Sequence, residues 1–561
     1  MADNHGHKPI AIVGSGFAGS AVLIHTLLRV AADDSITSPV KIVMMERKPE
    51  NLHAGLAYGK APEYRSHNLN IGSKRVNPFP AGKNPPGFPT FPEYIQQLAQ
   101  ENPAMEAALT NPPRQLFGDY IHHLVGLAVE KAGNKADVET IYRQATRVEE
   151  HDHGATVEFA DGSSMEACNV VLATGFQDAL APKFAAAAAK SLRFMETPYS
   201  LKANGFFDRV CSDEDAQNVM IIGTGLTAMD AAVRLKKSGY NGTITMMSRR
   251  AIMHKPYEPT PADEYMHGKL RGEPRPEAEL EFTKHPPHFL KANTTEDLVR
   301  SVVREFSTLT GKHGYLPEEV LAYWERFVPD VAKKFPHADF GALIHANEVL
   351  ITANRAGVTP DIGVAINEML ESGQLQVRAA AVTKLTEEND KMVCHFNPMD
   401  GEVSFRAKNE FNAKAPDPQT TQFDYVISAM GNTASYNPVS SEILDPLWGD
   451  LMKSGKATPH WTKMGVAVAD NFSLIDAEGN ASQHISVIGV PVAGHMMVTP
   501  YKYPEKPGAG GRLGPMALNV TGITGATLAF METEYDRLVG GFRGKEGSLS
   551  KRPRVEVGVN A

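Results

Sequence analysis

Three glycines near the start of the chain have the spacing of a dinucleotide-binding turn. Gly14, Gly16 and Gly19 form a GxGxxG pattern between the strand-like run at 8–13 and a stretch expected to be a helix. The glycines of this pattern permit a tight turn, a close approach to a pyrophosphate and close helix packing, and the helix N-terminus binds the phosphates. We therefore expect a nucleotide cofactor here. The bland alternative is a glycine turn in an ordinary doubly wound sheet.

An acidic residue ends the next expected strand. Glu46 closes the run VKIVMME, about 27 residues after the last glycine, where roughly 20 is usual. The polar loop at 32–39 accounts for the extra length, and the carboxylate is placed to accept hydrogen bonds from ribose hydroxyls. Phe17 and Ala18 in the turn and Arg47 beside the acid are assigned to the same cofactor site.

A second glycine pattern occurs near the middle of the chain. It reads GxGxxA between the apolar run NVMII and another expected helix. The residues assigned to this second cofactor site are Gly223, Gly225, Leu226, Thr227 and Ala228. Two such units predict two dinucleotide-sized folds.

The strand after the second pattern ends in basic residues instead of an acid. A hydroxyl and two guanidinium groups, from Ser248, Arg249 and Arg250, suit the 2′-phosphate of NADPH. NADH is the less favoured cofactor, and a solvated basic strand end is the structural alternative. An enzyme that transfers hydride from NADPH to bound FAD requires two nucleotide-binding folds. Here the first would bind the ribose of FAD through an acid, and the second would bind the 2′-phosphate of NADPH through basic residues.

These elements must be positioned by more than one domain, because 561 residues exceed a single compact core. We predict an α/β protein with two Rossmann-type dinucleotide-binding domains, for FAD and NAD(P)H, and a helical insertion in the second. The expected parts are 1–205 for the first part of the FAD domain, 206–435 for the NAD(P)H domain with its insertion at about 261–354, and 436–561 for the second FAD part with a disordered tail. Gly175, which ends a buried strand, is assigned to the FAD site.

The composition of the chain argues against a nucleic-acid-binding protein and against an integral membrane protein. The chain is 42% hydrophobic and 22% charged, as in ordinary globular proteins, and its net charge of −9 argues against nucleic acid as a partner. No apolar run approaches the roughly 18 residues of a membrane span, and no signal peptide precedes the first strand, so we expect a cytoplasmic protein without an integral membrane segment.

The three cysteines constrain the chemistry. Cys168, Cys211 and Cys394 stand far apart in the sequence, so they form neither a CxxC redox pair nor a zinc-ligand spacing. We therefore expect no metal site and no disulfide reductase chemistry.

Several segments resemble a known family. The residues above match the large group of two-dinucleotide-fold flavoproteins, which includes flavin monooxygenases, through most of the chain. The narrower resemblance is to the YdhS-like FAD/NAD(P)-binding proteins, a bacterial family related to FAD-dependent urate hydroxylase. The segments that carry it are GLAYG at 55–59, HNLNIGSKR at 67–75, PRQLFGDY at 113–120 and SRR at 248–250.

The resemblance implies further site residues. Tyr58, Asn68 and Asn70 would lie in the FAD environment, and Gly489 would meet the ribityl chain of the flavin. The helix near 519–524 would point its N-terminus at the pyrimidine edge of the flavin, where its dipole stabilises an anionic reduced form.

The expected helical insertion carries part of the same resemblance. YWERF at 323–327 and NRAGVTP at 354–360 resemble the family's insertion. A basic cluster of the family is reduced here to Arg355.

Three functions remain open from the sequence. The favoured one is an NADPH-dependent monooxygenase, in which hydride reduces FAD, oxygen adds as a flavin hydroperoxide, and one oxygen atom passes to a small organic substrate. A nitrogen heterocycle is the substrate that the family suggests. The alternatives are a reductase or dehydrogenase that passes electrons to a quinone or protein acceptor, and a non-catalytic flavin-binding module. His254, His495 and Tyr501 stand where a substrate could bind, but no catalytic residue is assigned, and the oligomeric state is unknown.

Overall fold

The computed structural model describes most of the chain. The described residues are 8–59, 68–69, 73, 76–80, 83–109, 112–176, 182–198, 203–254, 280–315, 317–344, 347, 358, 360–399, 417–430, 445–499 and 520–543. The expectations for Asn70, Arg355, Tyr501 and the C-terminal tail fall outside these residues.

The first sheet is built from both ends of the chain. Its strands are β1 (Ile10–Val13), β2 (Val40–Glu46), β3 (Ala136–Tyr142), β7 (Asn169–Leu172), β15 (Ser473–Ile475) and β16 (Ala481–Val487). They lie in the order β15-β16-β7-β1-β2-β3, and every neighbouring pair is parallel except β15 with β16. The carboxyl ends of the five parallel strands therefore meet at one edge of the sheet.

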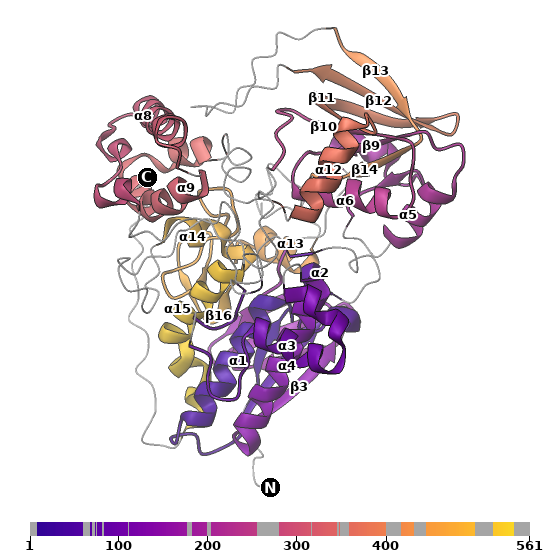
Figure 1. Ribbon diagram of the computed structural model, residues 1–561. Coiled ribbons are helices and arrows are strands. Elements are labelled where there is room, and N and C mark those ends of the chain that lie inside the picture. The colour runs from indigo at the N-terminus through magenta and orange to yellow at the C-terminus, as the bar shows by residue number, and fades with distance from the viewer. Residues whose placement is uncertain are drawn as a thin grey trace.

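Helices cover this sheet, which explains why β1 and β7 are buried along their whole length and are apolar apart from Asn169, the first residue of β7. Helix α1 (Phe17–Ala32) packs against α4 (Arg114–Ala132) and α15 (Val520–Val539). Figure 1 shows α15 alongside the first sheet, although almost the whole chain separates it from α1.

Two smaller structures border this unit. The antiparallel strands β4 (Ala145–His151), β5 (Gly154–Phe159) and β6 (Ser164–Ala167) form a separate three-stranded sheet, against which α13 (Pro446–Lys453) packs. Helix α3 (Phe91–Glu101) begins with a capping box, in which Thr90 and Glu93 satisfy each other's backbone amides.

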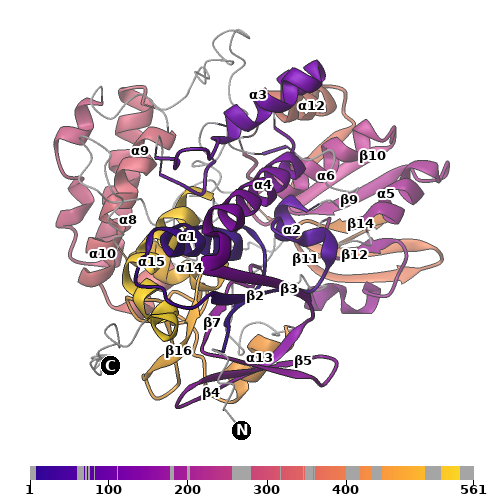
Figure 2. The same cartoon turned by 90° about the horizontal axis from the view of Figure 1, so that it is seen from below.

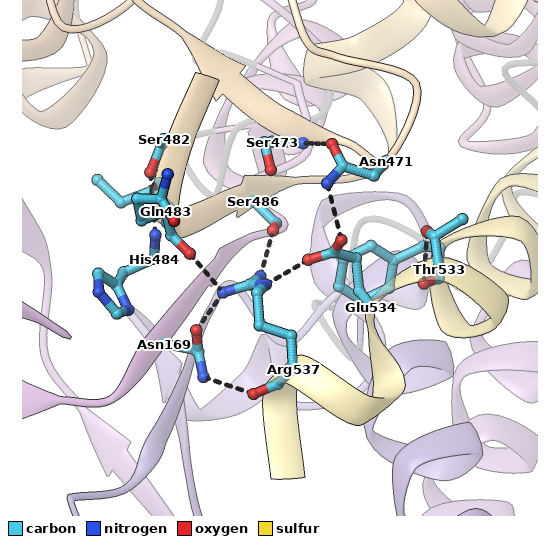
Figure 3. Close-up of polar contacts among 12 residues, drawn as sticks. Asn169, Asn471, Ser473, Ser482, Gln483, His484, Ser486, Thr533, Glu534 and Arg537 are labelled. Atoms are coloured by element: carbon cyan, nitrogen blue, oxygen red, sulfur yellow. Dashed lines mark hydrogen bonds and ion pairs between the residues drawn. The ribbon is translucent and has the colours of Figure 1, made fainter. Parts of the chain in front are cut away.

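A partly buried arginine, Arg537, connects α15 to the first sheet (Figure 3). The Arg537 guanidinium donates to Ser486 Oγ at 2.7 Å, to the Gln483 carbonyl at 3.0 Å, and to Asn169 and Glu534. Glu534, which is 2% exposed, also accepts from Asn471 Nδ2 at 2.9 Å. One side chain therefore joins α15 to β7 and β16.

The second sheet has seven strands. They are β8 (Phe194–Met195), β9 (Asn218–Ile222), β10 (Thr243–Ser248), β11 (Leu375–Glu388), β12 (Lys391–Pro398), β13 (Gln419–Phe423) and β14 (Tyr425–Ser428). Their order is β13-β12-β11-β10-β9-β14-β8; β12 is antiparallel to both of its neighbours, β11 and β13, and the other neighbouring pairs are parallel. Strand β8 belongs to this sheet although it precedes residue 205, and the exact domain boundaries stay a prediction.

The helices of the second unit lie beside this sheet. They are α5 (Ala203–Ser212), α6 (Leu226–Lys237) and α12 (Pro360–Glu371), and α6 packs against α12. Between β10 and β11 the chain forms a group of helices that includes α8 (Thr295–Ser307), α9 (Pro317–Trp324) and α10 (Val328–Lys334). Figure 1 and Figure 2 both place this insertion and the second sheet on opposite sides of the molecule.

The structure confirms the predicted fold class: an α/β protein with two Rossmann-type folds and a helical insertion. Among the helices that the structure describes, none combines the length and the apolar character that crossing a membrane requires.

Candidate functional site

The first glycine turn is sterically closed around two of its glycines. Gly14 has φ +102°, and a Cβ there would lie 2.4 Å from the Ala173 carbonyl oxygen. A Cβ on Gly19 would lie 2.0 Å from the Gly14 carbonyl oxygen. Any larger residue at either position would force the backbone apart, so the tight turn and the close start of α1 both require glycine.

The middle glycine meets the GLAYG segment. A Cβ on Gly16 would lie 3.5 Å from Gly55 Cα, and a Cβ on Gly55 only 2.9 Å from Gly16 Cα. Gly55 has φ +59° and begins the short helix α2 (Gly55–Tyr58). The structure thus places GLAYG beside the nucleotide-binding turn, and half-buried Tyr58 packs its ring on Phe117 with centroids 4.9 Å apart.

Glu46 lies at the same turn and is already engaged there. Its carboxylate accepts from Ser15 Oγ at 2.7 Å, from the Ser15 amide at 3.4 Å, and from the amides of Arg47 and Lys48 at 2.8 and 3.2 Å. The side chain is 9% exposed. Glu46 therefore braces the glycine turn, a role that its predicted contact with a ribose did not include.

Gly489 and Gly175 join the same edge of the first sheet. Gly489 follows β16 with φ +81°, and a Cβ there would lie 2.8 Å from Ala18 Cβ. Gly175 follows β7 with φ +71° and has open space around it. Phe17, which was also assigned to the cofactor site, is buried, and its ring centroid lies 5.7 Å from that of Phe117. Its side chain therefore belongs to the hydrophobic core.

The two glycine turns differ at their middle glycine, because Gly16 of the first turn lies against Gly55 and Gly225 of the second turn has no such neighbour among the described residues. Gly223 has φ +120°, and a Cβ there would lie 2.5 Å from the Ala429 carbonyl oxygen, as at Gly14. Among the described residues, no atom lies within 4 Å of the position that a Cβ on Gly225, at the N-terminus of α6, would take. Leu226 and Thr227 are partly buried and Ala228 is fully buried. The described part of the chain therefore leaves the Cβ side of Gly225 open, which is compatible with a phosphate at this helix start.

The SRR residues lie in three different environments. The Ser248 hydroxyl accepts from the Ala251 amide at 3.0 Å and lies 2.9 Å from Thr224 Oγ1, which in turn donates to the Ile252 carbonyl. Ser248 therefore holds the loop after β10. Arg249 is exposed, whereas Arg250 is only 5% exposed.

A polar bridge between the two units was not foreseen from the sequence. Arg114, at the start of α4, donates to Asp230 Oδ2 on α6 at 3.2 Å and to the Asn68 carbonyl at 3.0 Å. Asn68 Nδ2 lies 3.3 Å from Asp361 Oδ2 on α12. Burial raises the pKa of Asp230, and Arg114 opposes that shift. An acid in the otherwise apolar face of α6 was the available signal.

The candidate acid–base histidines are buried. His254 and His495 are 6% and 5% exposed. Burial lowers the pKa of His495 to about 4, and burial together with His495 lowers that of His460 to about 3. These last two imidazoles therefore favour the neutral form at physiological pH, in which one ring nitrogen donates a hydrogen bond and the other accepts one.

Comparison with known proteins first identifies the class of fold. A protein family described as FAD-NAD(P)-binding matches residues 11–177, which contain the first glycine turn, Glu46 and Gly175. No curated protein sequence matches the chain significantly. The narrower YdhS-like resemblance is not confirmed by these comparisons.

Solved structures extend the likeness to nearly the whole chain. The ornithine hydroxylase of Pseudomonas aeruginosa is 14% identical with a TM-score of 0.55, covering 94% of this chain and 99% of that protein. The ornithine N-hydroxylase of Kutzneria sp. 744 is 12% identical with a TM-score of 0.53, covering 94% and 99%. The L-lysine 6-monooxygenase of Pseudomonas syringae is 13% identical with a TM-score of 0.52, covering 95% and 100%. At such identities the likeness establishes the fold alone.

Proposed function

We propose that this chain is an FAD-dependent NAD(P)H oxidoreductase and, more narrowly, a monooxygenase that hydroxylates a small organic substrate. The observation that carries the proposal is the pair of glycine turns, each between a parallel strand and a helix, on two separate sheets of one chain. The family match over the first turn supports FAD there. The fold shared with ornithine and lysine hydroxylases supports oxygenation and a nitrogen-containing substrate.

The first turn fits a flavin dinucleotide. Gly14 and Gly19 keep the backbone tight, and the amides at the start of α1 would bind the pyrophosphate. Gly489 brings the end of β16 against α1, where the ribityl chain would run. Tyr58 is the last residue of α2, whose first residue, Gly55, lies against Gly16. FAD, when bound, supplies both the acceptor for hydride and the reactivity toward oxygen.

The second turn fits the nicotinamide cofactor. The open space at Gly225 leaves room for the pyrophosphate. Arg249 is the exposed residue of SRR, and its guanidinium would bind the 2′-phosphate that distinguishes NADPH from NADH. Ser248 and buried Arg250 would support this site by fixing the loop after β10.

The cysteines argue against a dithiol as the next electron acceptor. Cys168, Cys211 and Cys394 are all free, and they lie between β6 and β7, in α5 and in β12, respectively. Burial raises the pKa of Cys168 to about 11, that of Cys394 to about 12, and that of Cys211 as well. Protonated, separate thiols do not form the redox pair of a disulfide reductase.

The test follows the visible spectrum of the purified protein. We expect oxidised flavin bands that bleach when NADPH is added without oxygen and return when air is admitted. Nitrogen heterocycles and diamino acids are then screened for substrates that speed NADPH and oxygen consumption and yield an oxygenated product. No flavin spectrum after FAD is supplied would refute the proposal. Sustained turnover with a quinone, without an oxygenated product in air, would instead favour the reductase.

A matched variant locates the flavin. Gly16→Val places a branched side chain against Gly55 and in the path of the pyrophosphate, so we expect FAD to be lost. Gly126→Val, at an exposed position of α4 with no atom within 4 Å, controls for the same substitution elsewhere and should keep FAD.

A further inference from the structure

The helical insertion contains a partly open cavity that the proposed cofactor sites do not use. Its volume is about 120 Å³, and its walls come from α8, α9, α10 and the segments around them. Phe289, Leu298, Val302 and Leu343 supply apolar wall. An engineered apolar cavity of about 150 Å³ stays dry and binds benzene, so this space suits a molecule of one small ring.

One polar group in the wall has no hydrogen-bond partner among the residues that the structure describes. Trp324 lines the cavity and is 5% exposed, and its indole Nε1 donates to none of these residues. The Phe289 ring holds the indole edge-on, with centroids 5.0 Å apart. Because an indole N–H can only donate, the group that would satisfy it is a hydrogen-bond acceptor.

The neighbouring residue limits the charge of a ligand. Glu325 also lines the cavity and is 7% exposed. A carboxyl group in these apolar surroundings supplies no positive charge to balance a second anion. The same surroundings would penalise any charge that the ligand brought without a partner.

We propose that the helical insertion holds a binding site for a small neutral ring compound that carries a hydrogen-bond acceptor, such as an aryl ketone. The ring fills the apolar cavity, and the acceptor takes the Trp324 indole hydrogen. The proposal goes beyond the flavin chemistry and does not depend on it, because every wall residue named belongs to the insertion.

The first test compares three probes on the full-length protein, by ligand-observed NMR and by titration of tryptophan fluorescence. Acetophenone has the ring and the acceptor, cumene has a similar shape without the acceptor, and benzoate is an anion. We expect saturable acetophenone binding at about 1 mM or tighter, cumene binding roughly 5- to 10-fold weaker, and no benzoate binding. Absence of saturable acetophenone binding, or tighter binding of benzoate, would overturn the proposal.

Two variants, with a third as a control, test whether the probes bind in this cavity. Trp324→Phe keeps an aromatic wall without the donor, so acetophenone affinity should fall to that of cumene while cumene affinity is unchanged. Val302→Phe fills the cavity and should abolish both, whereas Val364→Phe, at a 49% exposed position of α12, should change neither. Far-ultraviolet circular dichroism and the melting temperature establish that each variant is folded. Unchanged binding to folded Val302→Phe would show that the compounds bind elsewhere.

Discussion

At the scale of single residues, residues of the same type at neighbouring positions differ in their burial and in the space around them. Arg249 and Arg250 are adjacent in the chain, yet one is exposed and the other is buried. Gly223 is confined by the Ala429 carbonyl, whereas Gly225 faces open space. In the proposed function, Gly225 and Arg249 are therefore the positions where the dinucleotide would contact the second fold.

The first prediction concerns the preference of the enzyme for NADPH over NADH. Arg249→Ala should raise the KM for NADPH about tenfold or more, because one charge-assisted contact to phosphate is lost, and should leave the KM for NADH and the FAD content unchanged. Steady-state kinetics with both cofactors measure the effect. Arg300→Ala, on the exposed surface of α8, serves as the control and should change neither constant. An unaltered preference for NADPH in Arg249→Ala would place the 2′-phosphate elsewhere.

A buried histidine gives a prediction for pH. Burial lowers the pKa of His25 to about 4, and its Nε2 lies 2.9 Å from the Pro78 carbonyl oxygen. The unfolded chain binds a proton at this position below about pH 6.5 and the folded chain does not, so stability falls as the pH drops from 6.5 toward 4. The contribution is about 3 kcal/mol.

His25→Gln tests this contribution, because glutamine can donate to Pro78 but cannot be protonated. Urea unfolding at pH 7 and at pH 4.5 should show a smaller loss of stability for the variant than for the parent protein. His313→Gln, at an exposed position, should retain the parent's pH dependence. An equal loss in His25→Gln would mean that other groups control this range.

At the scale of elements, α4 shows how one helix serves two purposes along its length. Its first turn carries Arg114 toward the second unit, and Gly118 lets α2 approach closely. A Cβ on Gly118 would lie 2.3 Å from the Tyr58 carbonyl oxygen. Further along, Gly126 is exposed and touches nothing that would require glycine.

The two glycines of α4 predict opposite effects of the same substitution. Gly118→Ala should destabilise the protein by about 1–3 kcal/mol and displace Tyr58, because the methyl group overlaps the α2 backbone. Gly126→Ala should stabilise it by about 0.5–1 kcal/mol, since alanine loses less entropy in a helix. Urea midpoints at constant slope measure both changes. Similar midpoints for the two variants would contradict the close approach of α2.

At the scale of the whole molecule, the two nucleotide-binding units are joined by a buried ion pair. Arg114 and Asp230 have side chains that are 11% and 4% exposed. Their contact fixes α4 of the first unit against α6 of the second. Hydride can pass only between cofactors held in one geometry, so a contact that sets the orientation of the units also bears on the rate.

A double-mutant cycle tests this bridge. Arg114→Met or Asp230→Leu alone should cost about 3–5 kcal/mol, because each leaves a buried charge without its partner, and the double variant should recover most of the loss. Anaerobic flavin reduction by NADPH should stay slow in all three. The exposed pair Arg300 and Asp297, 3.1 Å apart, is the control and should contribute less than about 1 kcal/mol. Additive losses at Arg114 and Asp230 would show that the two residues do not interact.

The local features of this protein were determined by its sequence. The turns at Gly14 and Gly223 were predicted correctly, because a glycine with positive φ between an apolar strand and an apolar helix depends on neighbours only a few residues away. The fold class followed from the repetition of this unit. Short-range spacing is enough for such features, since backbone conformation and helix starts are set locally.

Only the tertiary structure decided which distant residues meet. The contact of Gly16 with Gly55, the bridge from Arg114 to Asp230 and the unpaired indole of Trp324 each join or depend on segments that are separate in the sequence. Periodicity indicates that a face is buried, but it does not indicate which partner buries it. Those partners are selected by the packing of whole helices and sheets, where shape and burial act together over the entire chain.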